Sequence, residues 1–186
     1  MQVMELETGR LLLRQWKDSD LPVFAALNSD PAVMKYFPIL LSREASDAMA
    51  EKCRSLISER GWGFWATELK ENNKFIGFVG LHEPKDTFPF APSVEIGWRL
   101  LGNYWGKGYA TEAATQALQF SFDTLDLHEV VSFTPASNSR SRSVMDRIGM
   151  INTCQNFKHP DLPKNHSLSE HVLYKITKNQ WQKSGL

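Results

Sequence analysis

The chain has 186 residues, of which 42% are hydrophobic and 23% are charged, a balance typical of a globular protein with a sizeable buried core. Its 21 basic and 21 acidic side chains cancel, which argues against steering to nucleic acid by the overall field. No apolar run reaches membrane-spanning length and no signal-peptide core opens the chain, so we expect a cytoplasmic protein without a membrane partner. We expect a single domain over residues 1–186.

The cysteines and histidines offer no sign of a disulfide framework or a metal site. Cys53 and Cys154 are far apart and form no CxxC motif, so we expect two reduced, buried thiols. The five histidines show neither the HExxH pattern nor paired ligand spacing. We therefore expect no metal.

The first half of the chain predicts a strand, two helices and a hairpin. A strand over residues 11–16 precedes an Asp/Ser cluster and Pro22, which mark a helix start. Ser42 caps a second helix that ends at Gly61. Its apolar face is assigned by 3.6-residue spacing to Ala45, Ala48, Met49, Cys53, Leu56 and Ile57. Residues 64–69 and 75–81 then form a predicted hairpin.

The second half alternates strands and helices. A strand over 94–101 follows a proline-containing loop, and glycines lead into a helix over 106–124. The inner face of this helix carries small side chains that allow close packing on a sheet, namely Ala110, Ala113, Ala114, Ala117, Leu118 and Ser121. Strands are predicted over 130–134, 150–157 and 171–176, and a helix from 138 or 139 to 148. The residues after Lys178 form a short helix or are disordered.

The glycine-containing turn between the 94–101 strand and its helix suits an anion. A helix N-terminus presents free N–H groups and the positive end of the helix dipole. The turn is not a Walker A loop, because three residues rather than four separate Gly102 from Gly106, and Gly108 stands where the hydroxyl residue is needed. It is not a dinucleotide fingerprint either, because Thr111 replaces the third glycine. A nucleotide-phosphate binder is therefore disfavoured.

Three segments, taken together, are specific to one family. They are Leu6-Glu7-Thr8-x-Arg10-Leu11-x-Leu13-Arg14, Glu95-Ile96-Gly97-Trp98 continuing through Tyr104-Trp105-Gly106-Lys107-Gly108-Tyr109-Ala110-Thr111-Glu112-Ala113, and Asn138-x-x-Ser141-x-x-Val144-Met145-x-Arg147-Ile148-Gly149-Met150. In this order they resemble the GCN5-related N-acetyltransferase (GNAT) superfamily, and within it the ribosomal-protein N-terminal alanine and serine acetyltransferases. The resemblance implies an α+β fold: a mostly antiparallel sheet of six to seven strands with about four helices. Asn103 departs mildly from the usual first residue of the acetyl-CoA loop.

The resemblance implies acetyl-CoA as the donor. The pyrophosphate would be wrapped by Trp105, Gly106, Lys107, Gly108, Tyr109, Ala110 and Thr111, the two glycines allowing close backbone approach and unusual dihedrals. Lys107 either adds a charge-assisted contact or points to solvent. Trp98, Arg99 and Leu100 would lie along the pantetheine arm, with a strand N–H polarising the thioester carbonyl. Asn138 would contact the pantetheine, serve as a helix N-cap, or do both.

Two residues are candidates for proton transfer. Glu95 matches an acidic position used as a general base in some relatives, although an exposed or structural carboxylate is the alternative. The tyrosine acid common in the superfamily is replaced by Met145. The ribosomal-protein branch uses a serine matching Ser141, as an acid or as a hydrogen-bond donor, unless it is only a solvated helix hydroxyl. Arg140 and Arg142 either meet the 3′-phosphate or are solvated, and the second is favoured.

The acceptor is an amine that the sequence does not name. Aromatic residues of the first helices and of the loop before the central strand either wall the acceptor or belong to the core or a dimer surface: Tyr36, Phe37, Trp62, Phe64, Phe88 and Phe90. We expect an N-acetyltransferase acting by direct attack on acetyl-CoA, with a protein N-terminus as acceptor. The alternatives are a small-amine acetyltransferase (antibiotic, polyamine or amino-acid derivative) and a non-catalytic CoA-binding module. The protein is expected to be a monomer or a homodimer.

Overall fold

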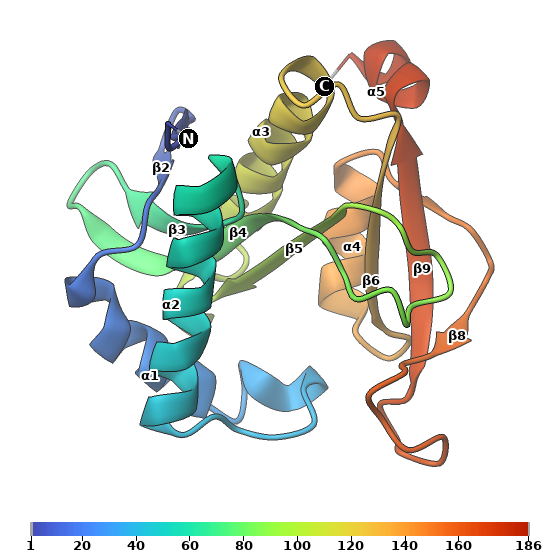
Figure 1. Ribbon diagram of the computed structural model, residues 1–186, viewed down its shortest axis with the longest axis horizontal. Helices are drawn as coiled ribbons and strands as arrows, with labels where there is room; N and C mark the ends of the chain where they lie inside the picture. Colours follow the sequence, from blue (N-terminus) through green and yellow to red (C-terminus); the bar gives the residue numbers. More distant parts are fainter. Residues whose placement is uncertain (1, 186) are drawn as a thin grey trace. The chain divides into compact units, whose positions relative to one another are not determined.

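The computed structural model describes residues 2–185 and has the expected mixed α and β fold (Figure 1). Within that range it contains five α-helices and a nine-stranded sheet of order β1-β2-β3-β4-β5-β6-β9-β7, with β8 paired to β9. The strands beyond the expected six or seven are two-residue pairings (β1, β7 and β8), too short to leave a sequence pattern. The chain forms two compact units, Met1–Leu81 with Gly97–Ala117 and His82–Ile96 with Leu118–Leu186.

The first unit contains an antiparallel ladder built from local turns. Its strands are β1 (Leu6–Glu7), β2 (Leu11–Arg14), β3 (Phe64–Leu69) and β4 (Lys74–His82). The predicted hairpin is β3 and β4, in which Leu69 pairs with Lys74 across the asparagine turn. Gly77 has φ +136°, and a Cβ on it would lie 2.1 Å from the carbonyl oxygen of Arg99. Only glycine fits this close approach of backbones.

Helices α1 (Leu21–Ser29) and α2 (Arg43–Arg60) lie side by side in this unit (Figure 1). The predicted ends of α2 are confirmed: Ser42 Oγ accepts a hydrogen bond from the Ala45 N–H, and Gly61 is left-handed with φ 88°. The predicted inner face was partly wrong, because Ala45 and Ala48 are exposed. The buried face is instead formed by Ser46, Ala50, Cys53 and Ile57.

Ser46 turns inward because it is hydrogen-bonded. Asn28 Nδ2 of α1 donates to Ser46 Oγ at 2.9 Å, and both residues are fully buried. A satisfied polar pair is tolerated in a core, and apolar periodicity does not reveal it. The core thiol predicted at Cys53 is confirmed, and burial raises its pKa to about 11.

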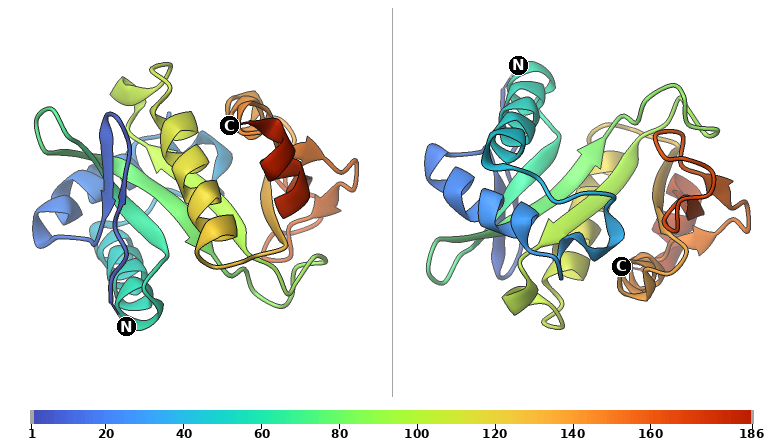
Figure 2. Two further views of the ribbon diagram at one scale, coloured as in Figure 1. Left: turned by 90° about the horizontal axis from the view of Figure 1, so that it is seen from above. Right: turned by 90° about the horizontal axis from the view of Figure 1, so that it is seen from below.

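The second unit is organised around β6 (Glu129–Pro135) and β9 (Glu170–Thr177), which pair antiparallel along their whole lengths. Helix α4 (Ser139–Arg147) follows β6, and α5 (Lys178–Ser184) follows β9 directly, as Figure 2 shows from two sides. The short helix expected after Lys178 is thus present over Lys178–Ser184. Its Thr177 and Gln180 form a reciprocal capping box, and Trp181 packs against Phe122.

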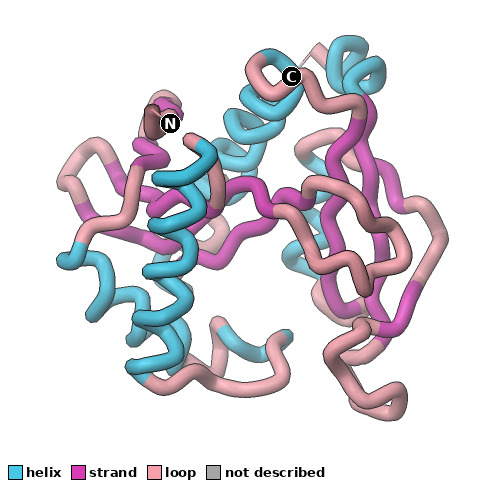
Figure 3. The backbone as a smooth tube through the Cα atoms, viewed as in Figure 1, coloured by secondary structure: helices cyan, strands magenta, loops and turns pink. Residues whose placement is uncertain are grey.

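The strand predicted over 150–157 is wrong in its middle. Only β7 (Ile151–Asn152) and β8 (Phe157–Lys158) are extended, and Figure 3 draws loop between them. Asn152 Oδ1 accepts from the Cys154 N–H at 2.9 Å, and Cys154 has φ 58°. This side-chain turn competes with strand pairing. Cys154 is also exposed, contrary to the expected burial, and both cysteines are free thiols.

Candidate functional site

Strand β5 (Glu95–Leu100) and helix α3 (Tyr109–Asp123) carry the anion turn between them. A short 3₁₀ turn, η3 (Gly102–Tyr104), leads from β5 into the loop. Gly106 and Gly108 have φ values of 73° and 82°, so the loop adopts a conformation that other residues adopt only with strain. The first helical N–H groups of α3 have no partner within the helix. The loop therefore has the features expected of a phosphate cradle.

Arg10 of the first unit braces this loop, which sequence spacing did not reveal. Its Nη1 donates to the Lys107 carbonyl at 3.1 Å, and its Nε donates to Glu112 Oε2 at 2.6 Å. The guanidinium lies 4.5 Å from the centroid of the Tyr109 ring. Thr8 Oγ donates to the other oxygen of Glu112 at 2.6 Å. In the sequence, the only indication of this contact is that Thr8 and Arg10 belong to the first of the three family segments.

Glu112 is the anchor of this brace. Partial burial acts to raise the pKa of its carboxyl, but the hydrogen bonds from Thr8 and Arg10 outweigh it and the pKa is lowered. The carboxylate is thus charged at neutral pH and holds Arg10 over the loop. A Cβ on Gly108 would lie 3.4 Å from Arg10 Nη2, and the positive φ of 82° makes any side chain there strained.

The side chains around the loop differ in exposure. Lys107 is exposed, and its Nζ lies 5.6 Å from the centroid of the Tyr104 ring. Trp105 Nε1 donates to the Leu100 carbonyl at 2.8 Å, tying the loop to the end of β5. Trp98 is partly exposed, whereas Arg99 and Leu100 are buried.

Glu95 lies in the second unit, at the start of β5. It pairs in parallel register with Val131 of β6, and Ser132 Oγ donates to the neighbouring Ile96 carbonyl at 2.8 Å. The residue keeps some exposure, but desolvation of its carboxyl raises the pKa to about 8. Within residues 2–185 no hydrogen bond or ion pair reaches this carboxyl. A partly accessible carboxyl with a raised pKa is suited to taking a proton near neutral pH.

Asn138 and Ser141 form a second constellation in the same unit. Asn138 is the N-cap of α4, its Oδ1 accepting from the Ser141 N–H at 3.3 Å. Its Nδ2 donates to Thr134 Oγ at 2.9 Å and to Ser141 Oγ at 3.1 Å. The Ser141 oxygen is thus already an acceptor, and no acceptor for its own proton is found among the described residues. The hydroxyl is left as a donor.

The other residues of α4 have structural roles. Met145 is buried and packs into the core of its unit. Arg142 Nη1 donates to the Ala136 carbonyl at 3.2 Å, and its hydrogen bond with Tyr174 raises its pKa. Arg142 is therefore occupied by its own unit.

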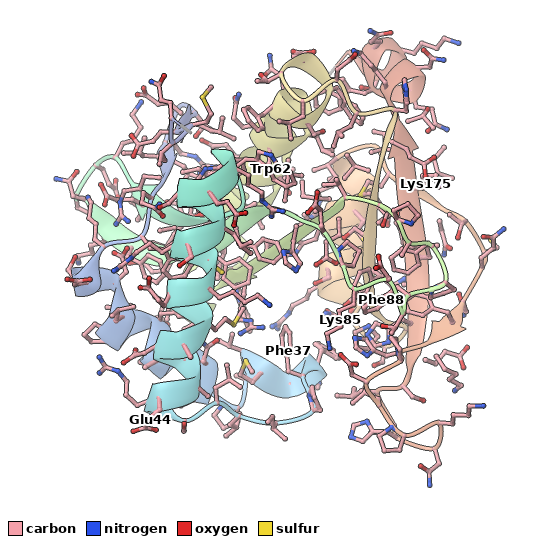
Figure 4. The ribbon with its side chains drawn as sticks, in the orientation of Figure 1. Phe37, Glu44, Trp62, Lys85, Phe88 and Lys175 are labelled. Carbon is pink, nitrogen blue, oxygen red and sulfur yellow. The ribbon has the colours of Figure 1, made fainter. Side chains whose placement is uncertain are left out.

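The aromatic candidates for the acceptor wall divide into two groups. Phe88 and Phe90 pack into a cluster with Phe133 and Phe157, Phe88 lying 5.0 Å from Phe133 between ring centroids. Phe88, labelled in Figure 4, is buried according to its low exposed fraction of 7%, so the core alternative holds for it. In the first unit, Trp62 stacks on Arg60 at 3.7 Å. The other candidates there are the partly exposed Tyr36 and Phe64 and the exposed Phe37.

Neither a metal cluster nor a membrane-spanning helix is present in the described part of the chain. Over residues 2–185, no group of three or more histidine, cysteine or acidic side chains is arranged to hold a metal ion. None of the helices in that range combines the length and apolarity needed to cross a bilayer.

Comparison with known proteins agrees with the geometry. Residues 10–151 match the model of the acetyltransferase (GNAT) domain. The uncharacterized N-acetyltransferase YnaD of Bacillus subtilis is 28% identical over 96% of this chain and 99% of its own length. The FsC-acetyl coenzyme A-N(2)-transacetylase of Aspergillus fumigatus is 28% identical over 95% of this chain and 77% of its own. YdaF of Bacillus subtilis, provisionally named a ribosomal N-acetyltransferase, is 28% identical over 61% of this chain and 60% of its own.

A solved structure extends the likeness to three dimensions. The crystal structure of a GNAT-family acetyltransferase from Bacillus anthracis aligns with a TM-score of 0.79 and 26% identity, covering 95% of this chain and 99% of that one. The family model alone spans most of the residues described above. The chain therefore belongs to the GNAT family of acetyltransferases, and its enzymatic class is acyltransferase.

Proposed function

We propose that this enzyme transfers an acetyl group from acetyl-CoA to the N-terminal amine of a protein, of the ribosomal-protein alanine or serine type. The observation that supports acetyl-CoA as the donor is the loop 105–111. It contains two glycines with positive φ and leads directly into the N-terminus of the 15-residue helix α3. Such a junction offers N–H groups and a helix dipole to a pyrophosphate. Residues 1–186 would act as one cytoplasmic GNAT domain, as a monomer or a homodimer.

Acetyl-CoA supplies a thioester whose carbonyl carbon is attacked by the acceptor nitrogen and whose sulfur leaves. The backbone of Trp98, Arg99 and Leu100 would pair with its pantetheine arm. This agrees with the β5–β6 pairing over the described residues, which is Glu95 with Val131 and does not include these three. One N–H of this strand would donate to the thioester oxygen as negative charge develops there, an effect worth roughly 3–4 kcal/mol. Asn138 would cap α4 and contact the pantetheine arm at the same time.

Glu95 would take the proton of the amine, directly or through water. Its raised pKa makes it a stronger base than an ordinary carboxylate, and the lack of an ion-pair partner leaves its oxygens free. Ser141 would donate its hydrogen bond to the departing sulfur. A serine hydroxyl is a poor acid at neutral pH, so we assign it stabilisation of the thiolate rather than full proton donation.

The acceptor assignment has support from two sides. The three family segments resemble the ribosomal-protein branch, and YdaF carries a ribosomal N-acetyltransferase name. The rival is a small amine, favoured by the longer match to the Aspergillus fumigatus transacetylase, whose name specifies an N(2) acceptor. We place the protein N-terminus first because the family segments include the serine at position 141.

The test is an acceptor screen with release of free CoA as the readout. Peptides with alanine, serine or methionine N-termini, polyamines, amino acids and aminoglycosides would each be offered with acetyl-CoA. We expect alanine and serine peptides to give the highest kcat/KM, with acetylation of the α-amine located by mass spectrometry. Turnover confined to small amines would overturn the N-terminal assignment while keeping the enzyme class.

Removing the Ser141 hydroxyl should slow the leaving-group step. Ser141→Ala is expected to lower kcat by roughly 10- to 100-fold, because a hydrogen bond to a charged group contributes about 1.5–3 kcal/mol. The affinity for acetyl-CoA should change little, since the sulfur gains charge only during the reaction. The measurement is kcat alongside the cofactor-induced rise in melting temperature.

The matched control is Ser143→Ala, which removes the same group two positions along α4. It should retain the kcat of the unmodified enzyme. If the kcat of Ser141→Ala lies within twofold of that of Ser143→Ala, Ser141 has no role in the reaction and is only a hydroxyl on the helix surface.

A further inference from the structure

Arg99 is a buried arginine whose side chain the proposed mechanism does not use. It lies on β5, is 8% exposed, and its Nη1 donates to Asn28 Oδ1 of α1. Asn28 is itself fixed, because its Nδ2 donates to Ser46 Oγ of α2. The guanidinium is thus held in one orientation by a buried polar chain across three elements of the first unit.

The guanidinium has no anionic partner among residues 2–185. Its Nε is enclosed and without a hydrogen-bond acceptor, and neither an acceptor for Nη2 nor a carboxylate is found within reach among residues 2–185. Desolvation without a compensating anion lowers the pKa of Arg99 to about 10. The one titratable neighbour acting on it is the Cys53 thiol. A buried charge without a counter-ion lowers the stability of the folded protein. Its presence therefore points to a function of Arg99 other than stabilising the fold.

Arg14, in the same unit, shows what a paired buried arginine looks like here. It is 3% exposed, and its guanidinium donates to both oxygens of Asp20 and to Glu68 Oε2 at 2.6–2.9 Å. Two carboxylates therefore surround Arg14, whereas no carboxylate of the described part of the chain pairs with Arg99. The difference is not one of burial, and it suggests that the missing partner of Arg99 comes from outside the chain.

The guanidinium lies one side-chain layer below the surface. It is 3.9 Å from the ring centroid of Phe37 and 5.5 Å from that of Phe78. Phe37, labelled in Figure 4, is 38% exposed on the segment after η2 (Met34–Tyr36). Ile39 and Leu40 on the same segment are 66% and 49% exposed. Phe37 is also one of the aromatic residues predicted to wall the acceptor. A movement of this ring would open the guanidinium to a ligand.

We propose that Arg99 receives a carboxylate carried by the acceptor, so that the preferred acceptors are primary amines with a nearby carboxylate. This inference rests on the proposed function, because it names the substrate class of that same acetyl transfer. The unpaired Nε and Nη2 form the side-on fork that binds both oxygens of a carboxylate. Nη1, already bonded to Asn28, holds that fork in place. Arg99 is thus a specificity-determining residue, and Phe37 moves aside when the acceptor enters.

The first experiment uses matched acceptor pairs on the unmodified enzyme. One arm compares peptides whose second residue is glutamate or glutamine behind the same serine N-terminus. The other arm compares free amino acids with their carboxamides. In at least one arm the carboxylate member should have a kcat/KM roughly 10- to 100-fold higher, the range for one charged hydrogen-bonded pair. The arm in which the two rates differ shows whether the recognised carboxylate belongs to a peptide side chain or to a free amino acid.

Variants at Arg99 assign the effect to that side chain. Arg99→Met should reduce kcat/KM for the carboxylate member to that of its amide, mainly through KM, and Arg99→Lys should recover only part of the preference because it lacks the fork. Arg43→Met removes an exposed arginine of α2 that pairs with Asp47, and it should leave the preference unchanged. Equal rates for both members of every pair would overturn the inference while leaving acetyl transfer established.

A binding measurement separates this inference from the proposed function. Titration calorimetry with CoA present needs no turnover, and it compares the serine–glutamate with the serine–glutamine peptide and a free amino acid with its carboxamide. Tighter binding of the glutamate peptide that is lost in Arg99→Met would support the carboxylate site even without acetylation. Equal binding of both peptides and of the amino-acid pair would refute it. Retention of the CoA-induced rise in melting temperature by Arg99→Met would show that the variant is folded.

Discussion

Replacing Glu95 with glutamine is expected to lower kcat/KM by about 10²- to 10⁴-fold, the usual contribution of a positioned general base. The isosteric amide keeps the shape of the side chain but cannot take a proton. Since burial raises the pKa of Glu95 to about 8, activity of the unmodified enzyme should fall as the pH drops through that value. The measurement is kcat/KM against pH between 6 and 10.

The acceptor complicates the profile in a useful way, because a peptide N-terminal amine itself titrates at a pKa of roughly 7.7–8.0. Two deprotonations are then needed, so log kcat/KM should rise with a limiting slope of 2 in the unmodified enzyme. Glu95→Gln should show a slope of 1, because the amine is then the one group whose deprotonation is still required. Equal slopes in the two enzymes would remove Glu95 from the role of base.

Stability gives an independent check on the same variant. The folded-state pKa of Glu95 lies above the ordinary value of 4.5, so the folded protein holds this proton more tightly than the unfolded chain between about pH 4.5 and 8. Its contribution to stability is therefore present below pH 4.5 and is lost as the pH rises through 8. Glu95→Gln should melt no lower than the unmodified enzyme at pH 8.5, so a loss of activity would not reflect unfolding. Glu170→Gln, on an exposed carboxylate of β9, is the matched control.

Replacing Gly108 with aspartate is expected to abolish most of the rise in melting temperature that acetyl-CoA produces. Gly108 has φ +82°, and a side chain there would meet Arg10, whose guanidinium holds the loop. The new carboxylate would also repel the pyrophosphate. Backbone strain alone costs about 1–3 kcal/mol, which corresponds to roughly 5- to 150-fold in affinity where the loop relaxes to escape it. The readout is a melting curve titrated with acetyl-CoA.

Gly102→Asp is the matched control, since it adds the same charge just before the loop. A Cβ on Gly102 meets nothing within 4 Å, and its φ is not in the left-handed region. This variant should keep the cofactor-dependent shift. If both variants respond to acetyl-CoA like the unmodified enzyme, the loop 105–111 is not the pyrophosphate site.

Features governed by a few adjacent residues were predictable from the sequence. The limits of α2 followed from Ser42 and Gly61, because caps act within one helical turn. The positive φ of Gly106 and Gly108 is likewise a local property of glycine in a turn. The strand between Glu95 and Leu100 was also foreseen, with its ends displaced by one residue.

Features that depend on partners distant in the chain were not predictable. The inner face of α2 was misassigned because Ser46 is satisfied by Asn28 on another helix. The continuous strand over 150–157 fails because the side chain of Asn152 captures a backbone N–H that the ladder would have used. An arginine without an anion, such as Arg99, looks in sequence like any other charged strand residue.

The bracing of the cofactor loop by Arg10 has a consequence for folding. The contacts of Arg10 with Lys107 and Glu112 join residues 97 and 102 positions apart in the chain. Long-range pairing of this kind forms late, because the loop-closure entropy must be met before the contacts stabilise anything. A peptide spanning only β5, the glycine loop and α3 would therefore lack the clamp that shapes the cradle. Recovery of acetyl-CoA affinity during refolding should lag behind helix formation and report the arrival of the N-terminal strand.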